Sequence, residues 1–204
     1  MQGILGWYMV KSGLVNSPHI SHFRLMLHFI TALFLLSYCY FLYLRVRVEY
    51  VYTVNITLTR LRIFSIILLL QIIYGTFVAG LNAGYAYNTY PLMNGSLFPN
   101  ELFMNNSLLE NFLLAPYSIQ YIHRTIGTLL LIFSLFIIYS EIKNNRINFL
   151  KSIELQLSSL IVFQFILGVS TLIFSVPIFI ALLHQVNTCF IVIKCLELHY
   201  YSNS

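Results

Sequence analysis

The sequence predicts an all-α integral membrane protein, with one complete four-helix transmembrane bundle and part of a second, pseudo-symmetric one. Hydrophobic residues make up 59% of the 204 residues and charged residues only 8%, against about 25% charged in soluble domains. Apolar runs of about 20 residues, the length that crosses a bilayer, recur along the chain. A Gln-x-x-x-Gly motif also recurs, which indicates internal duplication.

The first element is a short apolar stretch at residues 1–10. It is too short to cross a bilayer, and no basic segment precedes it as in a signal peptide. We expect it to be the last half of a helix whose beginning is missing. Five runs that are long enough to span the membrane follow it. They are residues 22–44, 61–82, 117–140, 155–175 and 177–197.

The basic residues predict which ends of the spans face the cytoplasm, or the matrix in an organelle. Lys and Arg cluster in the connections after the first and third spans, whereas residues 83–116 contain neither and carry Glu101 and Glu110. Because cytoplasmic loops retain positive charge, we expect residues 83–116 on the opposite, outer side. The net charge of +5 therefore reflects membrane orientation, and no nucleic-acid partner is expected.

The Gln-x-x-x-Gly motif occurs three times, and each copy precedes a helix that carries a histidine. The sets are Gln2–Gly6 with His28, Gln71–Gly75 with His123, and Gln164–Gly168 with His184. Chance is the alternative, since small residues are frequent at membrane helix contacts. As repeats, the motifs predict a remnant of an N-terminal bundle at 1–58, a complete C-terminal bundle at 59–197 and a tail at 198–204.

His123 and His184 each lie seven residues after a proline, Pro116 and Pro177. If each proline starts its helix, both imidazoles lie about 10 Å below the outer helix ends, and His28 comes to a similar level. Histidine inside a membrane is costly and is usually functional. Two at one depth in a bundle suit axial ligands of a haem iron. The alternative is that each histidine hydrogen-bonds a carbonyl or hydroxyl between helices.

Small and basic neighbours of these histidines fit the haem interpretation. Gly127 and Ala181 leave room for a flat macrocycle on the two ligand-bearing faces. Arg24 and Arg124 lie toward the outer surface, where guanidinium groups can pair with haem propionates. The alternative for both arginines is that they extend to the membrane interface. A zinc or copper site is less favoured, because no third or fourth ligand lies at this depth.

The remaining histidines and the cysteines are assigned no chemical role. We expect three histidines to be solvated, namely His19, His22 and His199. The cysteines lie inside apolar runs without Cys-x-x-Cys spacing, which predicts packing rather than a disulfide framework or a zinc site. They are Cys39, Cys189 and Cys195.

Five ordered motifs resemble haem A synthase of the alphaproteobacterial and mitochondrial branch. They are residues 6–14, 21–28, 78–93, 120–124 and 182–185. The resemblance implies eight transmembrane helices in two bundles, each with a histidine pair. It also implies oxidation of the C8 methyl group of haem O to a formyl group, giving haem A for cytochrome c oxidase.

By position, the resemblance implies that His123 and His184 are the axial ligands of a haem b cofactor, and that His28 belongs to a substrate-side pair. The implied location is the inner membrane of a bacterium or of mitochondria. Haem O synthase and an electron donor are the implied protein partners, and a homo-oligomer is consistent with the family.

The family's Glu-x-x-x-His-Arg helix, which supplies the second substrate-side histidine and a catalytic acid, has no counterpart in the sequence. We therefore expect a C-terminal portion without the N-terminal catalytic helices, and assign no catalytic residue. Two other functions fit the spans. A b-type cytochrome module would carry electrons through a bis-histidine haem, and a haem-free transporter or scaffold would leave the matched histidines unexplained.

Overall fold

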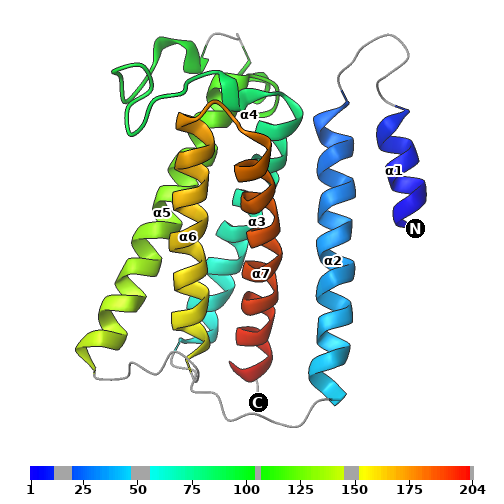
Figure 1. Ribbon diagram of the computed structural model, residues 1–204, viewed down its shortest axis with the longest axis vertical. Coiled ribbons are helices and arrows are strands. Elements are labelled where there is room, and N and C mark those ends of the chain that lie inside the picture. The colour runs from blue at the N-terminus through cyan, green and yellow to red at the C-terminus, as the bar shows by residue number, and fades with distance from the viewer. Residues whose placement is uncertain (12–19, 47–55, 104–106, 145–151, 203–204) are drawn as a thin grey trace.

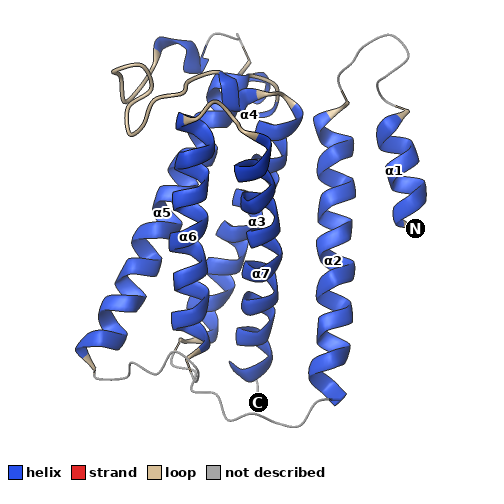
Figure 2. Cartoon of the chain, in the orientation of Figure 1, coloured by secondary structure: helices blue, strands red, loops and turns tan. Residues whose placement is uncertain are grey.

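The computed structural model describes residues 1–11, 20–46, 56–103, 107–144 and 152–202, and the regular elements in these residues are helices (Figure 2). Five helices are long and apolar enough to cross a membrane. They are α2 (His22–Val46), α3 (Leu58–Gly80), α5 (Pro116–Lys143), α6 (Ile153–Ile173) and α7 (Ile178–Ser202). The shorter elements are α1 (Gln2–Val10), α4 (Leu108–Leu113) and two 3-10 helices, η1 (Ala83–Tyr85) and η2 (Asn100–Phe103). The predicted all-α membrane class is confirmed.

Four of the long helices, α3, α5, α6 and α7, form a bundle (Figure 1). α5 packs on α3 and α6, and α7 packs on α6 and α3, so α5 and α7 occupy opposite corners. α2 packs against α3 and α7, and α1 packs against α2. The segment with α4 covers the end of the bundle where α5 and α7 begin (Figure 1). We call this end the outer end, in agreement with the orientation that the charges predict.

The last helix is longer than its predicted span. α7 continues to Ser202, although the sequence predicts a tail from residue 198. Leu198 is buried in the core, and Glu197 is buried in an ion pair with Lys194, whose Nζ lies 2.5 Å from Glu197 Oε2. The charges near the end of the run suggest a terminus, but pairing of these two charges allows the helix to continue.

A tight turn between α6 and α7 sets the start of α7. The N–H groups of Ser175 and Val176 donate to the carbonyls of Leu172 and Thr171, at 3.1 and 2.7 Å. This pattern is typical of a helix C-terminus with a left-handed residue. Val176 itself has φ of 60°, which is strained for a β-branched residue. A Cβ on Gly84 would lie 2.9 Å from Val176 Cγ2, so only glycine accommodates this turn.

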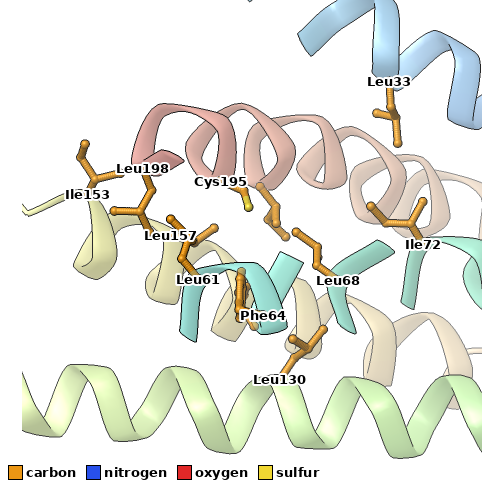
Figure 3. Packing of buried hydrophobic residues seen from close by; sticks show 12 residues of the cluster. Leu33, Leu61, Phe64, Leu68, Ile72, Leu130, Ile153, Leu157, Cys195 and Leu198 are labelled. Carbon is orange, nitrogen blue, oxygen red and sulfur yellow. The ribbon is translucent and has the colours of Figure 1, made fainter. Parts of the chain in front are cut away.

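The apolar core lies in the inner half of the bundle (Figure 3). Its members on α3 recur every three or four residues, a spacing that places them on one face. They are Leu61, Phe64, Leu68 and Ile72. Cys195 is buried among them, which confirms the packing role predicted for this cysteine. The polar motif residues of α3 follow where this stripe ends.

Two histidines predicted to be solvated are packed, so these predictions were wrong. His22 is 8% exposed, and its Nε2 lies 3.0 Å from the carbonyl oxygen of Leu113. His199 Nε2 lies 2.8 Å from Ser65 Oγ. The sequence does not reveal that the end of α4 meets the start of α2, or that α7 continues beside α3. The third, His19, lies outside the described residues.

Candidate functional site

Three histidines lie at one level in their helices. His28, His123 and His184 are six, seven and six residues after the first residues of α2, α5 and α7. At about 1.5 Å per residue, each imidazole is about 9–10 Å from its outer helix end. The depth predicted from Pro116 and Pro177 follows, because α5 begins at the first proline and α7 directly after the second.

Each of these imidazoles packs against the glycine of one Gln-x-x-x-Gly motif. A Cβ added to the glycine would lie 3.1, 3.1 and 3.4 Å from the ring Cε1 in the pairs Gly75–His123, Gly168–His184 and Gly6–His28. The repeated motif is therefore a repeated helix contact, made between α3 and α5, α6 and α7, and α1 and α2. Glycine allows each ring to lie directly on the neighbouring helix.

The bundle brings two of the three histidines together. His123 on α5 and His184 on α7 occupy opposite corners, close enough for a charge on one ring to act on the other. His28 lies on α2, which packs outside the four-helix bundle. Among the described residues, no group of three or more His, Cys, Asp or Glu side chains could hold a metal ion. The candidate donor set is thus a pair of imidazoles.

The imidazole nitrogens of the three histidines have few polar partners. Nδ1 of His28, His123 and His184 is buried without a hydrogen-bond partner in the described part of the chain. A buried polar atom left unpaired costs about 1–3 kcal/mol, and such atoms are uncommon in native proteins. The main-chain groups of Gln71 and Gln164 nevertheless lie close enough to the rings of His123 and His184 to act on them. Two imidazoles on opposite corners of one bundle, each seated on a glycine, fit an iron porphyrin as the group between α5 and α7.

In the α6–α7 pair, the motif glutamine of α6 is held in a closed hydrogen-bond network with α7. Gln164 Nε2 donates to the carbonyl oxygen of His184 at 2.9 Å and to Thr188 Oγ1 at 3.0 Å. Asn187 Nδ2 donates to Gln164 Oε1 at 2.7 Å and to the carbonyl of Leu160 at 3.0 Å. Sequence reasoning missed this network, although residues three and four positions after His184 share its helix face.

In the α3–α5 pair, the motif glutamine of α3 contacts the histidine ring of α5 instead. Gln71 Nε2 lies 3.4 Å from His123 Nε2. Gln71 Oε1 is buried and has no partner among the residues described. A Cβ on Gly127 would lie 3.0 Å from Gln71 Nε2. The Gln71 amide thus lies over Gly127, and room for a macrocycle beside this glycine stays a prediction.

The two arginines predicted to pair with propionates hold main-chain groups at the outer end. Arg124 Nη2 donates to the carbonyls of Thr89 and Pro91 at 2.9 and 3.0 Å. Its Nη1 is buried without a partner in the described ranges, so one donor remains for an anionic ligand. Arg24 Nη1 donates to the carbonyl of Tyr8 at 2.9 Å, and its guanidinium lies 3.9 Å from the Tyr8 ring centre. The propionate role remains a prediction.

The segment after α3 is fastened over the histidine pair. Gln120 Nε2 donates to the carbonyl of Tyr87 at 3.0 Å, and Asn88 Nδ2 donates to the carbonyl of Leu172 at 2.9 Å. Burial, together with the nearby Glu101 carboxylate, raises the pKa of the Tyr87 phenol to about 12. The phenol is therefore neutral at physiological pH, and the segment joins α5 and α6 without adding a charge at this position.

Comparison with known proteins gives consistent matches along the chain. The model of the COX15-CtaA family, described as cytochrome oxidase assembly protein, matches residues 1–196. Heme A synthases from Wolbachia pipientis subsp. Culex pipiens and from Wolbachia sp. subsp. Brugia malayi are 41% and 43% identical over 91% of this chain. The Flavobacterium johnsoniae heme A synthase is 36% identical over 93% of it.

These alignments cover 55%, 54% and 57% of the three relatives, so the chain spans about half the length of the curated relatives it matches. No solved structure matches the chain.

Proposed function

Because the chain belongs to the COX15-CtaA family of cytochrome oxidase assembly proteins, we propose that it acts in the synthesis of haem A. The proposed reaction is oxidation of the C8 methyl group of haem O to a formyl group, which gives haem A for cytochrome c oxidase. The observation that carries the proposal is the pair of imidazoles of His123 and His184, at one depth on opposite corners of one bundle, each seated on a glycine.

The proposed cofactor is haem b between α5 and α7, with His123 and His184 as axial ligands. When bound, this group supplies an iron that changes between ferric and ferrous states and passes single electrons. Gly75 and Gly168 admit the two rings at close range. Arg124 offers its unpaired Nη1 to a carboxylate at the outer end.

The surrounding residues hold a covering segment over the outer end of this site. Hydrogen bonds of Gln120, Arg124 and Asn88 hold the segment after α3 over the outer end. A covered site of low dielectric strengthens the electrostatic interactions within it. We assign binding and orientation to these residues, and no catalytic residue.

The pairing of α1 with α2 repeats the same contact outside the bundle. Gln2 Nε2 donates to the carbonyl of His28 at 3.3 Å, and the His28 ring lies on Gly6. We propose that this face contributes His28 to the haem O substrate side, with Arg24 near its outer end. Proposed partners are haem O synthase as the supplier, an electron donor and further copies of the chain, in a bacterial or mitochondrial inner membrane.

Absorption spectra of single-histidine variants test the cofactor site. Substituting His123→Ala or His184→Ala is expected to abolish the low-spin b-type spectrum of the purified membrane protein. The controls are His199→Ala at the inner end and His28→Ala on α2, which should keep the spectrum. Equal spectra in all four variants would refute the ligand assignment.

Pigment analysis tests the reaction itself. The chain would be expressed in a strain that accumulates haem O because it lacks haem A synthase, and extracted haems would be separated by chromatography. Haem A is expected when the chain is co-expressed with a polypeptide that supplies a Glu-x-x-x-His-Arg helix, a motif that this sequence does not contain. Haem binding with no conversion of haem O would instead favour an electron-carrying b-type cytochrome.

A further inference from the structure

The two halves of the histidine pair differ at the position four residues after the histidine. In α7 this residue is Thr188, and its Oγ1 accepts a hydrogen bond from Gln164 at 3.0 Å. In α5 it is Gly127, which has no side-chain acceptor. The amide of Gln71 lies directly over this glycine, where a Cβ would approach its Nε2 to 3.0 Å.

Without that anchor, Gln71 contacts the ring that the proposed cofactor needs. The amide nitrogen can only donate, so the facing His123 Nε2 accepts through its lone pair. Nδ1 of the same ring is buried, so Nε2 is the nitrogen left to face a ligand. A metal would use the same lone pair that Gln71 occupies.

The ring contact of Gln71 differs from the contacts of the equivalent glutamines, and it is weak. The equivalent glutamines donate to the main-chain carbonyl of the histidine, Gln164 to His184 at 2.9 Å and Gln2 to His28 at 3.3 Å. The 3.4 Å contact of Gln71 with the ring is at the weak end of hydrogen-bond geometry. A ligand on the ring can therefore displace this contact at low cost.

We infer that Gln71 is a positioning residue that caps His123 Nε2 and is displaced from it when the ring becomes a ligand. This inference rests on the proposed haem site. His184 has no such cap, because Asn187 and Thr188 hold Gln164 away from its ring. The two axial positions are therefore unequal, and His123 is the one whose availability the chain controls.

Haem titration of the full 204-residue chain in lipid nanodiscs tests this role. Gln71→Met keeps the side-chain volume and removes the donor, so the affinity for added haem b is expected to rise about 2- to 10-fold, the range for one net hydrogen bond. The matched variant Gln164→Met should give no rise, since the amide of Gln164 donates to the main-chain carbonyl of His184 and not to its ring. In a His123→Ala background, Gln71→Met should have no effect on affinity.

A second variant supplies the missing anchor. Gly127→Thr places a hydroxyl where α7 has Thr188, and the atom it would meet is the movable end of Gln71. We expect nitrogen-15 NMR of the unloaded protein to show His123 Nε2 losing its hydrogen bond in both Gln71→Met and Gly127→Thr, with haem affinity raised in both.

The outcomes separate this inference from the cofactor site. If wild type and His123→Ala bind haem b equally, the proposed site itself is refuted. If His123 is required but Gln71→Met leaves the affinity and the NMR signal unchanged, or lowers the affinity with and without His123, Gln71 is a packing residue and only this inference is overturned.

Discussion

The α3–α5 and α6–α7 pairs place their histidines alike and hold them differently. In both pairs a glycine Cβ would lie 3.1 Å from the ring Cε1. The residues three and four positions after the histidine are Asn187 and Thr188 in α7, but Ile126 and Gly127 in α5. The motif on the preceding helix therefore sets the position of the ring, whereas the residues that follow the histidine decide where the glutamine amide points.

The two pairs therefore differ in whether the buried polar atoms of their side chains have hydrogen-bond partners. In α6–α7, Gln164 uses both its amide nitrogen and its oxygen. In α3–α5, Gln71 Oε1 and Arg124 Nη1 are buried without partners among the described residues. Because unpaired buried polar atoms are costly, these two atoms are candidates to meet the proposed ligand. The α3–α5 side is also the side over which the segment after α3 is fastened.

Substitution of the two motif glycines gives the largest expected effect. It tests the contact between glycine and imidazole that both helix pairs share. Gly75→Val and Gly168→Val each force a side chain into a space that the imidazole fills. We expect loss of haem binding and about 3 kcal/mol of destabilisation in both, from overpacking. Thermal unfolding and the haem spectrum measure this. Gly3→Val is the control, since a Cβ there meets no atom within 4 Å in the described part of the chain.

Removal of Asn187 tests the hydrogen-bond network that only the α6–α7 pair has. Asn187→Leu leaves Gln164 Oε1 and the carbonyl of Leu160 without their donor, at a cost of about 2 kcal/mol. The equivalent change Ile126→Leu keeps the volume and should cost less than about 1.5 kcal/mol. Unfolding in a denaturing detergent compares them. Equal losses would show that α7 does not depend on its network.

Thr188→Val removes only the hydroxyl from that network. About 1 kcal/mol of stability is expected to be lost, because Asn187 continues to hold Gln164. The same unfolding measurement applies. A larger loss than in Asn187→Leu would reverse the assigned order of the two anchors.

Alkaline pH acts on the segment that covers α5 and leaves the stability at pH 7 unchanged. Burial and Glu101 raise the pKa of Tyr87 to about 12, above its usual value of about 10. The neutral phenol thus stabilises the fold fully below pH 10, and this contribution is lost as pH rises toward 12. Tyr87→Phe should unfold like wild type at pH 7 and lose less stability between pH 10 and 12. Parallel alkaline curves would contradict the assignment.

Much of the fold follows from local patterns. Each of the five spans predicted from apolar length corresponds to a long helix in the structure. Pro116 begins its helix, and Pro177 directly precedes another. The depth of the histidine pair follows from these starts. The end of α7 does not, since Glu197 and Lys194 resemble the polar end of a span until they pair with each other.

The sequence by itself determined the helical membrane class, the level of the three histidines and the glycine spacing that receives them, because hydrophobic length and helix rise are properties of contiguous residues. Only the tertiary structure decided what each polar side chain meets. Gln71 and His123 are 52 positions apart, and Ser65 and His199 are 134 apart. Such contacts depend on how whole helices pack, so the cap on His123 and the contact of His199 with Ser65 could not be predicted from local sequence.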